Sequence, residues 1–348
     1  MSNEGNSGFL ELVLKSQARL AMPIAVYPGV ALTGARLSDV VTNPVAQFDA
    51  QAALQARYQT PFVLSAMDLS AEAEAFGCQL HWSEEEVPSV TGRLVTSLEE
   101  ARKLAVPKPG DRRTAVYLQT VALLRREFPK KLVLGGCIGP FSLAARMVGV
   151  SEALELTMAE PELMHLVLAK AAEFLGAYVS AFQRSGADGI IMAEPAAGLL
   201  SPKGMREFSS AYIKQIAAST ATGHFTLIYH NCAARLLHLP AILETQLSAY
   251  HFGAPMDLPA ALRQVPHGVI ICGNLDPAAV LIQSSPADIR LKVRDLLKAV
   301  EGFPNFVLSS GCDVPARAPL ANLDAFFEAV GVSVKEGATG PKLSTKTV

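Results

Sequence analysis

Short apolar runs recur along the chain, and each one ends in glycine, proline or a polar residue. The runs are 24-IAVYP, 62-FVLSA, 132-LVLGGC, 189-GIIMAEP, 225-FTLIYHN, 248-SAYHFG, 269-VIICGN and 306-FVLSSGC. Most of them are followed by a segment with helical periodicity, such as residues 151–186, where Leu, Met and Val recur at spacings of three and four. Nearly continuous apolar strands that alternate with amphipathic helices are typical of a parallel sheet covered on both faces.

Eight such units predict a single closed (β/α)8 barrel of the TIM type, preceded by an N-terminal helical extension. The length of 348 residues fits either one barrel or two average domains. A doubly wound open sheet is the competing architecture, but no glycine-rich dinucleotide fingerprint follows the first run. We therefore expect one barrel domain over residues 9–332, with a flexible N-terminus at 1–8 and a flexible tail at 333–348.

The segment 66–106 lies between the second apolar run and the next helical pattern, and it contains "WSEEEVP". A connection of this length inside a compact domain is typical of a functional loop. We expect it to form a lid or an excursion over the rim of the barrel.

Composition and charge exclude several classes of protein. The net charge is −2 with both signs mixed, whereas a nucleic-acid-binding protein normally has a basic stripe. Every apolar run is interrupted before the ~18 residues that a membrane-spanning helix needs, and "MSNEGNSG" has no signal-peptide core. We expect a cytoplasmic protein that does not bind a membrane, in which five cysteines are free thiols or metal ligands rather than a disulfide framework.

Residues with ligand or acid/base chemistry follow the predicted strands, at the end of a barrel where active sites form. They are Asp68, Cys137, Glu194, His230, Cys232, His251, Asn274 and Cys312. We therefore expect the functional residues of the protein at this rim. Cys78 and Cys272 lie in apolar contexts typical of core cysteines, and Cys137 lies closer to the predicted mouth.

His230 and Cys232 are two residues apart at a strand end, so that both side chains point to one face. Cys312 follows the last predicted strand, after a glycine that permits a tight turn. Two thiolates and one imidazole are a typical zinc set, and three protein ligands leave a fourth position open for catalysis. The alternative is that the cysteines are core residues and the histidine donates to a backbone carbonyl.

Four further rim residues are candidates for catalytic roles. Glu194 and His251 are each either a displaceable fourth ligand or a hydrogen-bond partner that orients a ligand. The alternatives are a cap of a loop for Glu194 and a packed imidazole for His251. Asn274 lies just past a strand end, facing the pocket in this interpretation, and Asp68 either meets a substrate N–H or caps the following helix.

Several motifs together resemble the uroporphyrinogen decarboxylase superfamily, and especially its methylcobamide:coenzyme M methyltransferase branch. They are "LTGARLSDVVTNP", "MDLSAEAEAFGCQLHW", "GPFSLAARMVG", "EPAAGLLSP", "YHNC", "YHFGAPMDL", "GNLDP" and "SSGCDVPARAPLANLDAF". The resemblance extends roughly from residue 10 to residue 330 and implies a (β/α)8 barrel. In this branch an H-x-C…C set holds a catalytic zinc, which places the ligands at His230, Cys232 and Cys312.

The resemblance implies that a methyl group moves from a methylated corrinoid such as methylcobalamin, carried by a separate corrinoid protein, to a small thiol acceptor such as coenzyme M. The decarboxylase would need an arginine-rich N-terminal stretch for its carboxylates, and only Arg19 and Arg36 occur in that region. Asp68 matches the key aspartate of the decarboxylase, but the methyltransferase branch has it too. A metal-free decarboxylase-type lyase and a corrinoid-binding protein without catalytic activity are the competing hypotheses.

Overall fold

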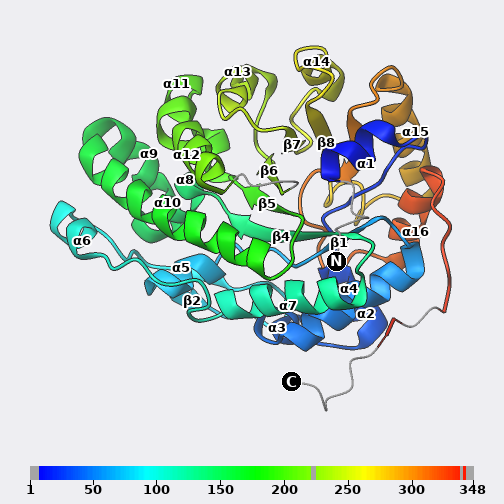
Figure 1. The fold of residues 1–348 in the computed structure, drawn as a ribbon, viewed down its shortest axis with the longest axis horizontal. Coiled ribbons are helices and arrows are strands. Elements are labelled where there is room, and N and C mark those ends of the chain that lie inside the picture. Colours follow the sequence, from blue (N-terminus) through cyan, green and yellow to red (C-terminus); the bar gives the residue numbers. More distant parts are fainter. Residues whose placement is uncertain (1–7, 221–224, 338–339, 342–348) are drawn as a thin grey trace, which may run out of the picture.

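The computed structural model describes residues 8–220, 225–337 and 340–341, and a curled sheet of parallel strands forms its centre (Figure 1). The order of the strands in the sheet is the order in the sequence, as in a TIM-type barrel. The seven strands are β1 (Phe62–Leu64), β4 (Leu132–Ile138), β5 (Gly189–Ala193), β6 (Thr226–Asn231), β7 (Ala249–Phe252), β8 (Ile270–Leu275) and β9 (Phe306–Ser310).

Helices surround these strands and cover the outer face of the sheet (Figure 1). The strand residues are buried almost without exception, which explains why their sequences are nearly all apolar. The longer helices are α4 (Pro44–Tyr58), α7 (Thr114–Glu127), α9 (Val150–Ala159), α10 (Pro161–Arg184), α12 (Ala211–Thr220), α15 (Pro286–Ala299) and α16 (Leu320–Ala329). The shorter ones are α1 (Phe9–Lys15), α2 (Val30–Thr33), α3 (Leu37–Thr42), α5 (Ala71–Phe76), α6 (Leu98–Lys103), α8 (Pro140–Val148), α11 (Pro202–Met205), α13 (Leu239–Leu243) and α14 (Leu258–Leu262).

The first apolar run does not form the eighth strand that the pattern predicted. The segment 20–24 lies along β9 in parallel, where Met22 N–H donates to Leu308 O at 2.8 Å, but only one bridge, between Ala21 and Leu308, forms. Directly after it, Tyr27–Gly29 is a 3-10 helix. Pro23 precedes the run and Pro28 ends it. Because proline has no N–H to donate to a ladder, this run continues the curl of the sheet as an extended segment rather than as a strand.

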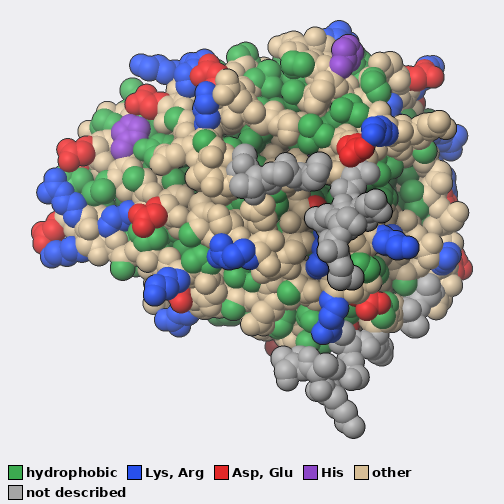
Figure 2. Space-filling view, in the orientation of Figure 1, with side chains coloured by type: hydrophobic (Ala, Val, Ile, Leu, Met, Phe, Trp, Pro, Cys, Tyr) green, Lys and Arg blue, Asp and Glu red, His purple; other side chains and the backbone are tan. Residues whose placement is uncertain are grey.

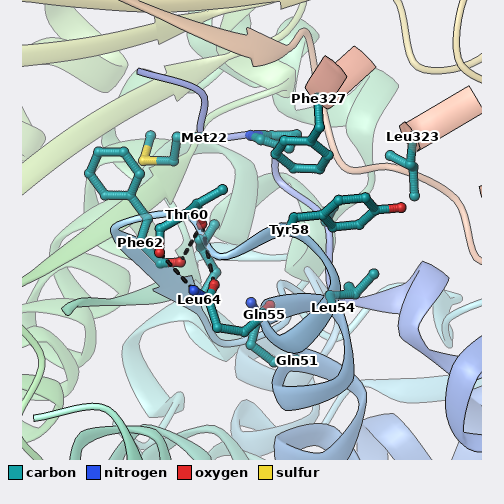
Figure 3. A pocket seen from close by; sticks show the side chains of 12 residues that line it. Met22, Gln51, Leu54, Gln55, Tyr58, Thr60, Phe62, Leu64, Leu323 and Phe327 are labelled. Carbon is teal, nitrogen blue, oxygen red and sulfur yellow. Dashed lines mark hydrogen bonds between the residues drawn. The ribbon is translucent and has the colours of Figure 1, made fainter. Parts of the chain in front are cut away.

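Side chains fill the seam between this segment and β1 (Figure 3). The rings of Tyr58 and Phe327 stack with their centroids 4.1 Å apart, and Tyr58 Oη donates to Asp324 at 3.0 Å. Arg57 donates twice to the same carboxylate, at 2.8 and 2.7 Å. The remaining cavity is about 20 Å³, room for about one water molecule. Packing between α4 and α16 therefore completes the wall.

The helical segment predicted at 151–186 is divided into α9 and α10 at Pro161, whose ring cannot continue a helix from the preceding turn. By length and composition α10 could cross a membrane, but 56% of its most apolar window is buried in the protein. Its apolar face packs against α8 and α12. The hydrophobicity of α10 thus has a structural explanation within the fold.

The segment 66–106 contains α5, α6 and an antiparallel pair, β2 (Gln79–His81) and β3 (Ser89–Thr91). The guanidinium of Arg113 lies over the Trp82 ring, 5.0 Å from its centroid, and this contact holds the hairpin against α7. On the face shown in Figure 2, Lys and Arg side chains are interspersed with Asp and Glu.

The predicted flexible ends fall mostly on residues 1–7, 338–339 and 342–348, which lie outside the described residues. Within the described part of the tail, the N–H of Lys335 donates to Arg57 O at 2.9 Å.

Candidate functional site

His230, Cys232 and Cys312 converge at the carboxyl ends of two strands that are not neighbours in the sheet. His230 is near the end of β6, Cys232 follows this strand directly, and Cys312 lies two residues past β9. Their ligand atoms all lie within 4.8 Å of one another. The edges of a tetrahedral zinc site with these ligands are about 3.4–3.8 Å, so small rotations of the side chains bring all three to one ion. The spacing and the soft donor set therefore fit zinc.

Two glycines allow the loops of the site to approach each other. A Cβ atom at Gly253 would lie 2.1 Å from Cys232 O, and one at Gly311 would lie 3.0 Å from Ala254 N. Gly311 was expected to permit a tight turn, but its φ is not in the left-handed region. Its role is instead close packing beneath the loop that carries Cys312.

A chain of hydrogen bonds orients the imidazole of His230. The Ser309 hydroxyl donates to Met22 O at 2.6 Å, so it accepts from His251 Nε2 at 2.7 Å. His251 Nδ1 then accepts from His230 Nδ1, 2.9 Å away. Burial lowers the pKa of His251 well below its ordinary value, consistent with this neutral tautomer. Because Nδ1 of His230 donates in this chain, its lone pair lies on Nε2, which is the atom that a metal ion would bind.

The two thiols of the site interact directly. Their hydrogen bond stabilises a thiolate on Cys232 and lowers the pKa of that group to about 7. The same bond, together with burial, raises the pKa of Cys312 to about 12. The first proton of the pair is therefore lost near neutral pH, and a cation that replaces the second would bind both sulfurs as thiolates.

The three side chains line a cavity of about 500 Å³ at the mouth of the barrel. Tyr27 lines it from the 3-10 helix, Met67 lines it from the loop after β1, and residues 85–89 line it from the β2–β3 hairpin. Segment 66–106 therefore does reach the rim. Arg146 and Arg317 also line the cavity.

Glu194 and Asn274 make contacts that hold loops in place. The buried carboxyl group of Glu194 accepts from the N–H groups of Phe141 (2.8 Å) and Ser142 (3.2 Å) at the start of α8. It therefore caps this helix, and burial raises its pKa to about 8. Asn274 donates to Gly253 O at 3.0 Å and to Met256 O at 2.8 Å.

Asp68 is buried in an ion pair with Arg113, whose guanidinium also binds Glu74 at 2.6 Å. The Asp68 carboxylate accepts from the Ser70 hydroxyl at 2.6 Å and from Tyr117 Oη at 3.1 Å. These contacts engage both of its oxygens. Cys137, with Cys78 and Cys272, is buried in the core.

Sequence reasoning missed Ser309 and Arg146, which both belong to this part of the structure. Ser309 is the first of two serines that end an otherwise apolar strand, and such a polar pair in a buried strand indicates side chains with hydrogen-bond partners. Arg146 is a cation in the last turn of α8, a helix that is otherwise nearly all buried. A charge in such a helix was also a usable signal.

The fold and the site together define an α/β protein of the TIM-barrel type, with a cluster of thiols and an imidazole at its mouth. Comparison with known proteins then identifies the family. The model of the family described as "Uroporphyrinogen decarboxylase (URO-D)" matches residues 23–332, so the chain belongs to this family.

Relatives with two different activities are similar to the chain. A methylcobamide:CoM methyltransferase, MtbA of Methanosarcina mazei, is 30% identical over 265 residues, which are 75% of this chain and 76% of the relative. A uroporphyrinogen decarboxylase of Shewanella loihica is 29% identical over 284 residues, 79% of each chain. The solved structure of a methyltransferase from Methanosarcina mazei has a TM-score of 0.82 at 22% identity, covering 92% of this chain and 96% of that one. This structural similarity supports the fold.

Proposed function

We propose that the protein is a zinc-dependent methyltransferase that moves a methyl group from a methylated corrinoid to a small thiol. The observation that carries the proposal is the convergence of His230, Cys232 and Cys312 on one edge of an open cavity. Three soft ligands with a free side toward a cavity are typical of a catalytic rather than a structural zinc site. Similarity to the methylcobamide:CoM methyltransferases supports the same activity.

Each residue of the site has a role in this proposal. Cys232, Cys312 and His230 Nε2 would hold the zinc, and zinc bound there would keep an incoming thiol deprotonated at neutral pH. His251 and Ser309 hold His230 in the ligating tautomer. The cavity is large enough for a small thiol, and its open mouth would face a methylated corrinoid such as methylcobalamin, presented by a separate corrinoid protein.

A metal-free decarboxylase-type lyase is the second candidate, because uroporphyrinogen decarboxylases are similar to the chain at nearly the same identity. Asp68 would be its central residue. In the structure this carboxylate is saturated by Arg113, Ser70 and Tyr117, which favours a structural role. The contacts therefore support the methyltransferase over the lyase.

Methyl transfer from methylcobalamin to a panel of thiols tests the proposal. The wild type should demethylate methylcobalamin, and Cys232→Ala should lower this rate at least ~100-fold, because the metal loses a ligand. Cys272→Ala is the matched control, since Cys272 is a buried cysteine outside the site. Porphyrinogen decarboxylation that survives Cys232→Ala, without methyl transfer by the wild type, would establish the lyase instead.

A further inference from the structure

The β2–β3 hairpin lies between two anchored points of the chain. Before the hairpin, the N–H of Cys78 donates to Ala73 O at 3.0 Å. After it, the N–H of Leu94 donates to Met147 O at 2.7 Å. Gly92 lies just inside the second anchor with a φ of 68°, and a Cβ atom built on it meets nothing within 4 Å. Because hinges are a few positions at the ends of elements that absorb a change of φ and ψ, Gly92 fits a hinge of this hairpin.

Few contacts hold the hairpin against the barrel. β2 and β3 have three residues each, and a two-stranded hairpin of this kind is marginally stable on its own. In the described part of the chain, the loop 82–88 makes no hydrogen bond to the barrel, and the N–H of Glu85 donates to Ser83 Oγ within the loop. Val87 and Val90 pack against the core, so the structure shows the hairpin closed. Such an element belongs to the parts of a fold that open locally at low cost.

A cation–π pair joins the hairpin to the barrel. The guanidinium of Arg113 lies over the half-exposed ring of Trp82, 5.0 Å from its centroid. Arg113 itself is buried and fixed, because it is paired with Asp68 and Glu74 and donates to Ser70 Oγ at 2.9 Å. A cation–π contact is stronger where the cation has lost water. Trp82 is therefore the movable half of a clasp, and Arg113 is the fixed half.

The loop of the hairpin also forms part of the cavity wall. Residues 85–89 line the same cavity as His230, Cys232 and Cys312. The cavity of about 500 Å³ lies in the range of pockets that hold a drug-sized ligand, whereas a corrinoid is larger than such a ligand. A small thiol fits beneath the closed hairpin, and displacement of the hairpin would widen the mouth toward a corrinoid.

We propose that the β2–β3 hairpin is a hinged lid of the cavity, and that Trp82 is a positioning residue that holds this lid closed through Arg113. The lid closes over the thiol and opens toward the methyl donor. This inference rests on the proposed function for the identity of these two occupants. Asp68 acts at a distance, because its ion pair fixes the guanidinium on which the lid closes. The motif from Asp68 to Trp82 thus contains both the anchor and the clasp.

Limited proteolysis measures how often the lid opens. Endoproteinase Glu-C cleaves after glutamate, and Glu84, Glu85 and Glu86 lie in the loop of the lid. Trp82→Leu removes the aromatic face and should accelerate cleavage after these residues about 5–30-fold, because cleavage follows the open population. Trp82→Phe keeps an aromatic face and should be cleaved within about threefold of the wild-type rate. Met158→Ala, which truncates an exposed apolar side chain on α9, is the matched control and should leave the rate unchanged.

Fluorescence separates a clasp from a merely structural role. Trp82 is the one tryptophan of the sequence, so its emission reports the position of the lid. Asp68→Asn removes the ion pair that fixes Arg113 and should increase the quenching of Trp82 by acrylamide at least ~twofold. The melting temperature of Trp82→Leu should stay within ~4 °C of the wild type, because the hairpin opens without unfolding the barrel.

Four results would overturn the inference. A wild-type cleavage rate in Trp82→Leu would refute the clasp. Unchanged quenching in Asp68→Asn would refute the anchor. Wild-type protein that is cleaved as fast as the urea-unfolded chain would show that no lid closes. A larger fall in the melting temperature of Trp82→Leu, with new cleavage sites outside the lid, would assign Trp82 to the stability of the fold.

Methyl transfer separates failure of this inference from failure of the proposed function. With methylcobalamin as donor, Trp82→Leu should raise KM for 2-mercaptoethanesulfonate at least ~fivefold and change kcat less than about twofold, because an open lid retains the thiol less well. If the wild type transfers no methyl group but the cleavage rates differ as expected, the lid stands and the methyltransferase proposal falls. If the wild type transfers methyl groups and Trp82→Leu has unchanged cleavage and kinetics, the lid falls and the methyltransferase proposal stands.

Discussion

Replacing His251 tests whether the buried hydrogen-bond chain orients the imidazole of His230. His251→Leu introduces an apolar side chain of similar size and removes the acceptor 2.9 Å from His230 Nδ1 and the donor 2.7 Å from the Ser309 hydroxyl. His230 Nδ1 keeps one weak alternative, the carbonyl oxygen of residue 251, at 3.3 Å.

The loss of this hydrogen-bond partner sets the expected change in zinc affinity. Leaving one buried donor poorly satisfied costs about 1–3 kcal/mol, and removing a partner behind a metal ligand typically weakens metal binding 10–100-fold. A 10–100-fold change corresponds to about 1.4–2.8 kcal/mol, so the two magnitudes agree. We therefore expect the zinc affinity of His251→Leu to fall 10–100-fold.

Competition with a chromophoric chelator measures this affinity, and thermal unfolding of the apoprotein measures stability separately. His165→Leu is the control, because His165 bonds to Tyr212 on another part of the molecule. A zinc dissociation constant of His251→Leu within twofold of the wild type would refute the orienting role. Ser309→Ala removes only the last member of the hydrogen-bond chain, the partner of His251 Nε2, and should lower the zinc affinity by an intermediate amount.

Three other substitutions test neighbouring parts of the account. Glu194→Ala leaves two backbone N–H donors of α8 without an acceptor. It should lower the free energy of unfolding in urea by about 2–4 kcal/mol and leave the zinc affinity unchanged. A large loss of zinc affinity would identify Glu194 as a ligand. Gly253→Ala places a methyl group against the backbone of Cys232 and should weaken zinc binding. Gly302→Ala is the control, because its methyl group meets nothing within 4 Å. Equal zinc affinities of the two variants would show that the loop with Cys232 moves without a loss of binding free energy. Burial raises the pKa of Glu72 to about 8 from an ordinary 4.5, so the folded state holds a proton that the unfolded state releases, and wild-type stability should fall as pH rises from about 4.5 to 8. Glu72→Gln removes this dependence, so its melting temperature relative to the wild type should increase between pH 5 and pH 8.5; parallel profiles would contradict the raised pKa.

The apolar pattern predicted the architecture well because buried parallel strands are apolar along their whole length. Seven of the runs are strands, and their order around the sheet follows the sequence. The strand predicted at 24–28 did not form, because side-chain hydrophobicity does not report which residues lack a backbone N–H for the sheet ladder. Pro23 and Pro28 both lack this N–H. The two prolines would have predicted an extended segment at the edge of the sheet instead of a strand.

The convergence of His230, Cys232 and Cys312 could be inferred because parallel strands of a barrel all end at the same mouth. The hydrogen-bond chain could not, because it depends on the register that places His251 beside His230 on the neighbouring strand. The ion pair of Asp68 with Arg113 also joins residues 45 positions apart, and no local pattern connects them. Side-chain partners across elements therefore required the folded structure.

The central claim is that His230, Cys232 and Cys312 form an open zinc site that binds a thiol. X-ray absorption at the zinc edge, on protein purified without chelator, tests it most directly. We predict about two sulfur neighbours at ~2.3 Å and nitrogen or oxygen neighbours at ~2.0–2.1 Å, with a third sulfur when 2-mercaptoethanesulfonate is added. Protein without zinc, or a sulfur count that the thiol does not change, would contradict the account.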